Sequence, residues 1–415
     1  MTRSAIKSMV ALCSSVALMT TAAADQDAQG GSRLDHVFVI VMENHAYGQI
    51  VGNPNAPFTN AYALASNTAD HYFAVAHPSL TNYLELVGGS NFGILSDNSP
   101  DWHDGACKPD IVAPYSQNRD DAGSGNVCPI AGSGKDAATV AIDTTNEVTK
   151  PYVPSLVNID GVSLASAQTI GKSIADQLVE RGRAWKSYQE SLPPTGADGV
   201  NASDGFLTDK SNIKAVLPAE SQTLIKLYAA KHNPFVYFRS VQEGGLNNVV
   251  GFEGPLGLFD DLSSGHVPDF SLIAPNQCND QHGRGNAGPA CDFDPGPLGD
   301  GTYNDGSTNF LNPALIYQGD VALRTIVNAI HGSKAWRQGR NAIVVVWDEN
   351  DYSAVDNQVL VIVDTSYGDH GIHSTRRYTH FSLLKSIEAG LGLPCLNHAC
   401  DANEPTMDDL FGPLR

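Results

Sequence analysis

Two continuous apolar runs constrain the fold of this chain more than any other feature. Residues 36–42 (HVFVIVM) and 342–347 (AIVVVW) are rich in β-branched side chains and do not alternate between polar and apolar positions. Strands buried on both faces, as in parallel sheets, have this pattern, whereas strands with one solvated face alternate. Both runs stop abruptly at polar residues. We therefore predict two central strands of a buried sheet.

Further strand and helix patterns alternate along the chain. Strands are predicted at residues 184–188, 234–238, 270–274 and 359–363. Helices are predicted at residues 80–87, 170–182, 220–231, 319–332 and 379–390. This alternation implies an α/β fold with a mostly parallel central sheet.

The pattern contains no internal repeat and no interdomain linker, so we predict that residues 34–415 form a single domain. Residues 25–33 are polar and are predicted to be a flexible N-terminal segment. Residues 90–168 are rich in Gly, Pro, Asn, Asp and Ser, which predicts a long insertion with little regular structure. Residues 275–309 are also predicted to be loop-like.

The N-terminus has the pattern of a secretory signal peptide. Arg3 and Lys7 precede the apolar residues 9–19, and residues 22–24 (AAA) supply a cleavage site of small residues. We therefore predict that residues 1–24 are removed and that the protein is secreted or periplasmic. No segment is long enough to predict a membrane span, so stable membrane insertion is not expected.

Six cysteines follow the predicted signal peptide, and they fall into three local pairs along the chain. In an exported protein this pattern predicts disulfides that close short loops. Pairing of nearest neighbours is the simplest of the possible connectivities: Cys107–Cys128, Cys278–Cys291 and Cys395–Cys400. The alternative of free or metal-binding thiols is weak, because no C-x-x-C spacing appears.

The charge of the chain argues against a nucleic-acid partner. Its 45 acidic and 25 basic residues give a net charge of -20, and the sequence has no basic stripe. Such a surface repels nucleic acids and anionic membranes.

Oxygen-bearing residues stand where the two central strands end, with Glu43-Asn44 after the first and Asp348-Glu349 after the second. Open α/β sheets bind ligands outside the carboxyl ends of their strands, and adjacent strands would bring the two pairs together. Converging carboxylates repel without a counter-charge, and neither pair has a neighbouring Lys or Arg, which indicates a metal ion. Oxygen ligands favour Ca²⁺, Mg²⁺ or Mn²⁺ over zinc. The alternative is that these side chains meet only water.

Ser79 is a second polar feature, preceded by Pro78 and followed by an apolar helical pattern. Residues 80–87 carry apolar side chains on one helical face, and Gly88-Gly89 would end the helix. Unpaired N–H groups and the helix dipole favour an anion at the helix N-terminus. A serine there is a candidate nucleophile for a phosphorylated substrate, and the alternative is an ordinary helix cap.

Five ordered stretches resemble the phosphoesterase family of bacterial and fungal acid phosphatases and non-haemolytic phospholipases C, within the alkaline phosphatase superfamily. They are residues 39–45 (VIVMENH), 77–89 (HPSLTNYLELVGG), 275–282 (PNQCNDQH), 347–350 (WDEN) and 378–388 (YTHFSLLKSIE). Any one stretch would be a weak signal, whereas five in order are specific. The resemblance implies a three-layer α/β sandwich like that of alkaline phosphatase, with disulfide-pinned loop insertions.

The resemblance also implies roles for individual residues. Ser79 matches the nucleophile, which would form a phosphoserine that water then hydrolyses. The residues implied as ligands of one divalent metal ion are Glu43, Asn44, Ser79, Asp348 and Glu349. We find no complete second set of ligands and expect a single metal.

Histidine and asparagine side chains are expected to bind the substrate. His282 and His380 are predicted to bind phosphate or to donate a proton, and Asn44 and Asn82 to contact the phosphoryl group. An imidazolium acid would give a mildly acidic pH optimum. Weaker candidates are His45, His77 and His373.

The substrate is predicted to be a small phosphorylated compound, and the protein a secreted acid phosphatase. Phospholipases C of the family that this chain resembles usually carry extra C-terminal β-rich domains, whereas this chain stops soon after Leu393 and lacks a basic amphipathic segment. The first alternative is a phospholipase C or another phosphodiesterase. An alternative of another class is a secreted metal-binding module without activity. The sequence does not indicate an oligomeric state.

Overall fold

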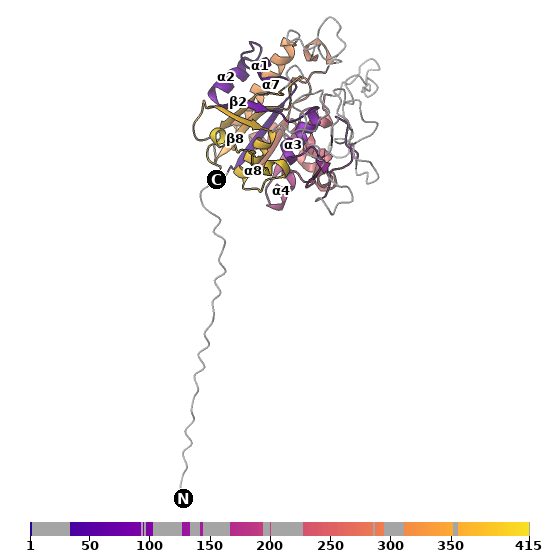
Figure 1. Cartoon of the computed structure of the whole chain (residues 1–415), viewed down its shortest axis with the longest axis vertical. Coiled ribbons are helices and arrows are strands. Elements are labelled where there is room, and N and C mark those ends of the chain that lie inside the picture. Colours follow the sequence, from indigo (N-terminus) through magenta and orange to yellow (C-terminus); the bar gives the residue numbers. More distant parts are fainter. Residues whose placement is uncertain are drawn as a thin grey trace.

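The computed structural model describes, besides residue 1, residues 34–92, 94, 97–102, 127–132, 142–143, 167–193, 200, 227–284, 287–293, 311–351 and 356–414. An eight-stranded sheet runs through the centre of this part of the chain (Figure 1). Its strands, in spatial order, are β10 (His373–Thr379), β2 (Asn67–Phe73), β9 (Val361–Thr365), β8 (Asn341–Trp347), β1 (His36–Met42), β7 (Phe270–Ala274), β5 (Trp185–Gln189) and β6 (Val249–Val250).

The sheet is mostly parallel, as predicted. Strand β9 is antiparallel to its neighbours β2 and β8, and every other pair of neighbours in this sheet is parallel. Strands β1 and β8 lie side by side, paired from His36 and Asn341 to Met42 and Trp347. All seven residues of β8 are buried, which explains its unbroken apolar sequence.

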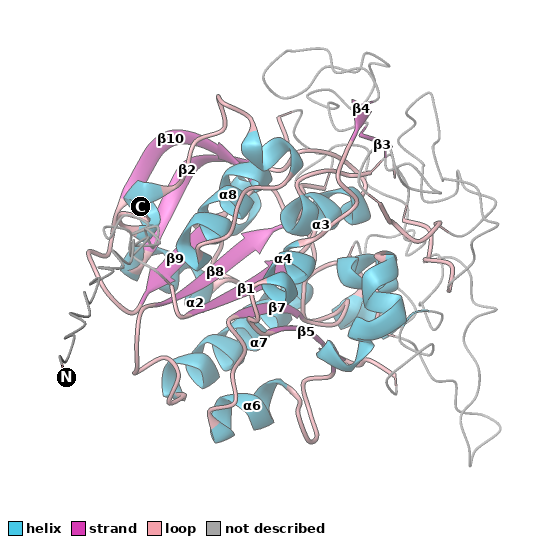
Figure 2. Cartoon of the chain, turned by 90° about the horizontal axis from the view of Figure 1, so that it is seen from below, coloured by secondary structure: helices cyan, strands magenta, loops and turns pink. Residues whose placement is uncertain are grey.

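Helices cover both faces of the sheet (Figure 2). Helices α3 (Ser79–Gly88), α4 (Ile174–Glu180) and α8 (His380–Leu391) lie on one face. Helices α2 (Pro57–Ala65), α6 (Leu258–Ser264) and α7 (Pro313–Gly332) lie on the other. Among the described residues, α1 (Tyr47–Ile50) and α9 (Asp408–Phe411) are short helices of one turn. The expected three-layer α/β architecture is therefore confirmed.

Helix α3 begins at Ser79 and is buried along its whole length. It ends at Gly89, which has a left-handed φ of 68°. A Cβ atom on Gly89 would lie 2.4 Å from the carbonyl oxygen of Leu396, so this position requires glycine for both its conformation and its space. The predicted Gly88-Gly89 helix end is confirmed.

Between β5 and β7, one prediction is wrong, and another is wrong over the residues of it that the structure describes. Residues 234–238 do not form a strand, because Pro234–Tyr237 is a buried 3₁₀ helix (η5) with N–H to O=C bonds from Val236 to Asn233 and from Phe238 to Phe235. A short apolar run fits a buried helical turn as well as a strand, and periodicity does not separate them. The described end of the predicted helix 220–231 is also not α-helical, since Ala230–His232 is a 3₁₀ helix (η4).

Several element bounds differ from the prediction. Helix α4 begins at Ile174 rather than at residue 170, because Ser173 caps it and the preceding Gly171 packs against the backbone of Ala131. Helix α7 begins earlier, where the Asn312 side chain accepts a hydrogen bond from the N–H of Ala314. Strands β2 and β10 and helices α2 and α6 were not predicted.

Two of the three predicted disulfides are confirmed, Cys278–Cys291 and Cys395–Cys400. The third involves Cys107, which lies outside the described residues, as does most of the predicted insertion 90–168. The described parts of that insertion include the antiparallel pair β3 (Ile142–Asp143) and β4 (Ala167–Gln168). The predicted signal peptide also lies outside the described residues, apart from residue 1. Among the described helices, none has both the length and the apolar character to cross a membrane.

Candidate active site

The polar residues at the ends of β1 and β8 meet at one edge of the sheet. The backbone N–H of Asn44 donates a hydrogen bond to Asp348 Oδ1 over 3.1 Å. Asn44 has a left-handed φ of 52°, which turns the chain sharply after the strand. The side chains of Glu43, Asp348 and Glu349 are all buried. The register of β1 and β8 thus produces the convergence that the sequence predicted.

Ser79 lies between two of these carboxylates. Its Oγ is 3.1 Å from Glu43 Oε2 and 2.9 Å from Glu349 Oε1. A serine hydroxyl has one proton and can donate to one acceptor at a time. The second contact therefore requires a protonated carboxyl or a cation nearby.

Two further side chains hold Glu349 in place. His77 Nδ1 contacts Glu349 Oε2 in a buried pair, and the Asn82 amide donates to the same oxygen over 3.4 Å. The Asn82 side chain also accepts hydrogen bonds from the N–H groups of Val75 and Ala76 and donates to the Ala76 carbonyl. Asn82 thus fixes the loop that leads into α3, and its predicted contact with the phosphoryl group stays a prediction.

His232 lies between two carboxylates on the other side of Glu43. Its Nε2 is 3.1 Å from Glu43 Oε1 and its Nδ1 is 3.1 Å from Asp280 Oδ2, although neither contact has hydrogen-bond geometry. The Tyr83 ring stacks on the imidazole with ring centroids 5.4 Å apart. The Glu43 N–H donates to the Asp280 carbonyl over 2.9 Å, which joins the two loops.

Lys231 and His282 complete this side of the cluster. The Lys231 ammonium is 3.0 Å from His282 Nε2 and 2.6 Å from Asp97 Oδ2. His282 Nδ1 lies 2.8 Å from the Gly283 carbonyl, so Nδ1 carries the proton and Nε2 accepts from the ammonium. Asp97 also accepts a hydrogen bond from the N–H of Leu80 in the first turn of α3.

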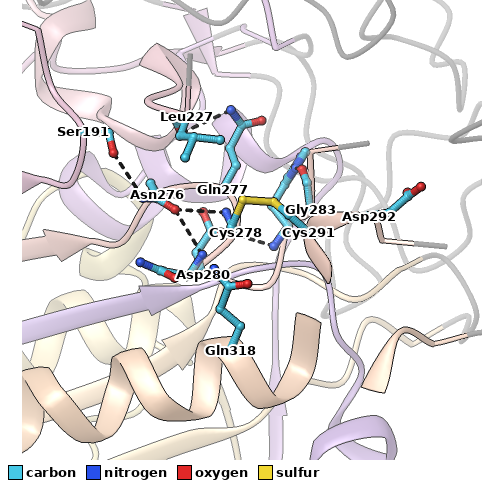
Figure 3. The surroundings of a disulfide bond; sticks show 12 residues. Ser191, Leu227, Asn276, Gln277, Cys278, Asp280, Gly283, Cys291, Asp292 and Gln318 are labelled. Atoms are coloured by element: carbon cyan, nitrogen blue, oxygen red, sulfur yellow. Dashed lines mark hydrogen bonds between the residues drawn. A yellow bond between two sulfur atoms is a disulfide. The ribbon is translucent and has the colours of Figure 1, made fainter. Parts of the chain in front are cut away.

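The loop that carries Asp280 and His282 follows β7 and is closed by Cys278–Cys291 (Figure 3). The Asn276 side-chain oxygen accepts hydrogen bonds from the N–H groups of Cys278 and Asn279. The N–H of His282 donates to Asp280 Oδ1 over 2.7 Å. The disulfide and these local bonds hold the side chains of Asp280 and His282 against the strand ends.

Burial and mutual repulsion raise the pKa of the clustered carboxyl groups. Burial is the main reason why the pKa values of Glu43, Asp280 and Glu349 lie well above their ordinary values, and the charge of Asp348 raises them further. Burial also raises the pKa of Asp348 to about 7. The Lys231 charge acts in the opposite direction on the first three groups. These carboxyls can ionise together only where more positive charge compensates them.

Buried atoms without hydrogen-bond partners among the described residues mark where a cation would fit. They are Glu43 Oε1, Asn44 Oδ1, Asp280 Oδ2, Asp348 Oδ2 and His232 Nε2. Oxygen and imidazole donors of this kind bind divalent ions, and buried polar atoms left unpaired are costly.

The cluster offers two adjacent sets of donors that share Glu43. One set is the predicted group of oxygen ligands at the ends of β1 and β8. The other is Glu43, His232 and His282, whose ligand atoms lie within 4.8 Å of one another. We name these the oxygen site and the nitrogen site.

His380 lies behind the cluster, at the first residue of α8. Its Nε2 donates to the backbone carbonyl of Asp348 over 2.7 Å, and its Nδ1 is 2.9 Å from the Tyr72 hydroxyl. Burial lowers the pKa of His380 to about 4, so the ring is neutral at mildly acidic pH. As placed, the ring orients Asp348, and its predicted role as a proton donor stays a prediction.

The weaker histidine candidates lie in different environments. His77 is buried against Glu349, and burial lowers its pKa to about 3. His45 donates from Nδ1 to the carbonyl of Glu43 over 2.9 Å. His373 begins β10, at the strand end opposite the cluster.

Sequence reasoning did not single out several residues of this cluster. Asp280 belongs to the stretch 275–282, in which only His282 had been chosen. Lys231 had been assigned to the end of a helix and Asp97 to the insertion, whereas His232 had been assigned to no element. The signal that could have found His232 is its position beside Asn233-Pro234, which predicts a turn rather than a helix interior.

A buried serine that faces clustered carboxylates, at the carboxyl ends of a mostly parallel sheet, fits a hydrolase that uses a serine nucleophile. The pattern of the Phosphoesterase family matches residues 53–290. This chain belongs to the Phosphoesterase family.

Relatives from bacteria and fungi align with most of this chain. It is 24% identical over 381 residues to a phosphatidylinositol-3-phosphatase of Mycobacterium tuberculosis, covering 91% of this chain and 83% of that protein. It is 22% identical over 382 residues to an acid phosphatase of Aspergillus fumigatus, and the alignment covers 90% of this chain and 58% of that protein. It is 23% identical to a probable acid phosphatase of Kluyveromyces lactis, and the alignment covers 90% of this chain and 62% of that protein. The chain thus spans less than two thirds of either fungal relative.

Solved structures are similar at lower identity. A protein of the alkaline phosphatase superfamily from Vibrio parahaemolyticus is 11% identical, with a TM-score of 0.42, covering 88% of this chain and 68% of that chain. A lipoteichoic acid synthase from Listeria monocytogenes is 8% identical, also with a TM-score of 0.42, covering 92% and 75%.

Proposed function

We propose that this chain is a phosphomonoesterase that hydrolyses phosphate esters through a phosphoserine on Ser79. The observation that supports this most directly is the place of the Ser79 hydroxyl. It stands at the first residue of α3, 3.1 Å from Glu43 Oε2 and 2.9 Å from Glu349 Oε1. The names of the acid phosphatase relatives support the same reaction class.

The oxygen site would hold one divalent ion, with Ca²⁺, Mg²⁺ or Mn²⁺ favoured by its donors. Its ligands would be Glu43, Asn44, Ser79, Asp348 and Glu349. A bound divalent ion supplies Lewis-acid chemistry, which lowers the pKa of a serine hydroxyl and stabilises charge on a phosphoryl group. The buried atoms of Glu43, Asn44 and Asp348 without partners among the described residues support this placement.

The side chains of this protein would carry out two transfers at phosphorus. Ser79 would lose its proton to a neighbouring carboxylate, and its Oγ would bond to phosphorus while the bond between phosphorus and the alcohol oxygen breaks. The alcohol would leave with a proton from solvent. Water would then lose a proton and bond to phosphorus while the bond to Ser79 Oγ breaks, which frees phosphate, and Oγ would regain its proton. The N-terminus of α3 and the Lys231 ammonium would stabilise the negative charge of the phosphoryl group. His77 and Asn82 would keep Glu349 oriented toward Ser79.

Turnover of p-nitrophenyl phosphate tests this proposal. Ser79→Ala should lower kcat/KM on the order of 10³-fold or more, because it removes the nucleophile. Ser263→Ala is the matched control, since Ser263 is exposed on α6 and has no role in the proposed reaction. Unchanged activity in Ser79→Ala would refute the catalytic assignment, and a wild-type protein without turnover would favour a binding module.

The substrate class is tested with a panel of phosphate esters. A monoester is expected to react, whereas preferential turnover of p-nitrophenylphosphorylcholine would favour a phospholipase C or another diesterase. The name of the mycobacterial relative makes a phosphoinositide monoester a useful member of the panel. The signal-like N-terminus supports secretion or export to the periplasm.

A further inference from the structure

Lys231 places a positive charge at the edge of the carboxylate cluster. It belongs to η4, and its side chain is only 12% exposed. The ammonium lies 2.6 Å from Asp97 Oδ2 and 3.0 Å from His282 Nε2. An ion pair so well enclosed holds the ammonium in one place.

The lysine contact involves the metal-ligating atom of the nitrogen site. His282 Nδ1 is committed to the Gly283 carbonyl, so Nε2 carries the lone pair that could bind a metal. A divalent ion such as Zn²⁺ would need to lie about 2.0–2.1 Å from that nitrogen. The lone pair cannot accept from the ammonium and bind an ion at the same time. Lys231 and a metal therefore compete for the nitrogen site.

Asp97 links this lysine to the helix of the nucleophile. One carboxylate oxygen of Asp97 binds the Lys231 ammonium, and the other accepts from the N–H of Leu80 over 3.0 Å. The ammonium is thus fixed relative to the first turn of α3. This arrangement gives the cluster a permanent cation beside the oxygen site.

We propose that the Lys231 ammonium, held by Asp97, occupies the second cation position of this centre, so that the chain binds one divalent ion and not two. The inference rests on the oxygen site of the proposed function. Removal of the ammonium opens the nitrogen site, where Glu43, His232 and His282 already converge.

Zinc stoichiometry tests the inference without using activity. The full-length protein and its variants are demetallated and dialysed against Zn²⁺, and bound zinc per chain is measured. Lys231→Ala should bind one more ion than the wild type. Lys231→Arg, which keeps the charge, and Lys334→Ala, which removes an exposed lysine elsewhere, should match the wild type.

A second substitution locates the extra ion. In the Lys231→Ala background, His282→Ala should return the stoichiometry to the wild-type value, because it removes a ligand of the nitrogen site. Asp97→Asn provides a second route, since it frees the ammonium without removing it, and should raise the zinc content in part. Circular dichroism spectra that match the wild type establish that each variant is folded.

Two results would overturn the inference. One is equal zinc stoichiometry in folded Lys231→Ala and wild type, and the other is an extra ion that remains after His282→Ala. Failure of the phosphatase proposal is distinguishable, because the Ser79→Ala comparison measures turnover whereas this experiment counts ions.

Discussion

Glu349 is the residue on which several contacts of the centre depend. It faces Ser79 through one oxygen and contacts His77 and Asn82 through the other. Side chains that orient a ligand in this way are worth about 10–100-fold in metal affinity or activity. The geometry of the serine therefore also depends on the histidine that contacts Glu349.

Substitution of His77 tests this dependence. We expect His77→Ala to lower kcat about 10–100-fold, with a smaller change in KM, because Glu349 loses its orienting partner. His77→Asn retains a polar partner and should recover part of the loss. Steady-state kinetics with p-nitrophenyl phosphate measure both values. An unchanged kcat in His77→Ala would contradict the role.

The residues of the site were predictable to different degrees. Glu43 and Asp348 could be found because the apolar strands before them mark where the chain leaves the sheet. Lys231 and Asp280 could not, because they reach the cluster from a short 3₁₀ helix and a loop whose positions depend on tertiary contacts. The residues around them show no hydrophobic periodicity from which the position of these segments could be predicted.

Helix α3, which begins at Ser79, ends at a left-handed glycine. Gly89 and Gly182 both have left-handed φ values, 68° and 66°. A Cβ on Gly89 would meet the Leu396 backbone at 2.4 Å, whereas a Cβ on Gly182 would have no atom within 4 Å. The two positions therefore differ in the room available for a Cβ atom but not in backbone conformation.

This pair allows a controlled measurement of stability. Gly182→Ala should cost about 1–2 kcal/mol of unfolding free energy, because a left-handed conformation disfavours a side chain. Gly89→Ala should cost clearly more, since the backbone must also shift. Urea unfolding of both variants measures the difference. Equal losses of unfolding free energy in the two variants would show that the close approach of Leu396 adds no cost.

Secondary structure was predictable where burial leaves a simple pattern. Strands β1 and β8 are buried on both faces, so their sequences are unbroken apolar runs. Strands β2 and β10 escaped prediction because both carry polar side chains, such as His71 paired with Arg377. Strand β10 lies at the edge of the sheet, and β2 is the next strand inward. The apolar run at Pro234–Tyr237 was misassigned because it is too short for its period to be determined.

The gain in folding stability that a bound metal gives should depend on pH. Without a cation, burial raises the pKa of Asp348 from an ordinary value of 3.8 to about 7. The folded state then retains a proton that the unfolded chain releases, so stability is lost as the pH rises through this window. His77 and His380 act in the opposite direction, because their lowered pKa values cost stability as the pH falls below their ordinary value of 6.5.

Thermal unfolding with and without EDTA separates these effects. The difference in Tm between the metal-loaded and EDTA-treated protein should grow from about pH 4 to about pH 7. Ligation stabilises by about 2.7 kcal/mol at a free metal concentration roughly a hundred times the Kd. His77 and His380 change the stability of the metal-loaded and the EDTA-treated protein by similar amounts, so their effects largely cancel in the Tm difference. A difference that shrinks with rising pH would contradict this account.

The central claim is that Ser79 becomes phosphorylated during turnover. The direct measurement is mass spectrometry of peptides from enzyme quenched with acid while it hydrolyses p-nitrophenyl phosphate. The account predicts one added phosphoryl group on the peptide that contains Ser79, and none in Ser79→Ala. Rapid turnover with no phosphoryl group on Ser79, or with the group on another residue, would contradict it.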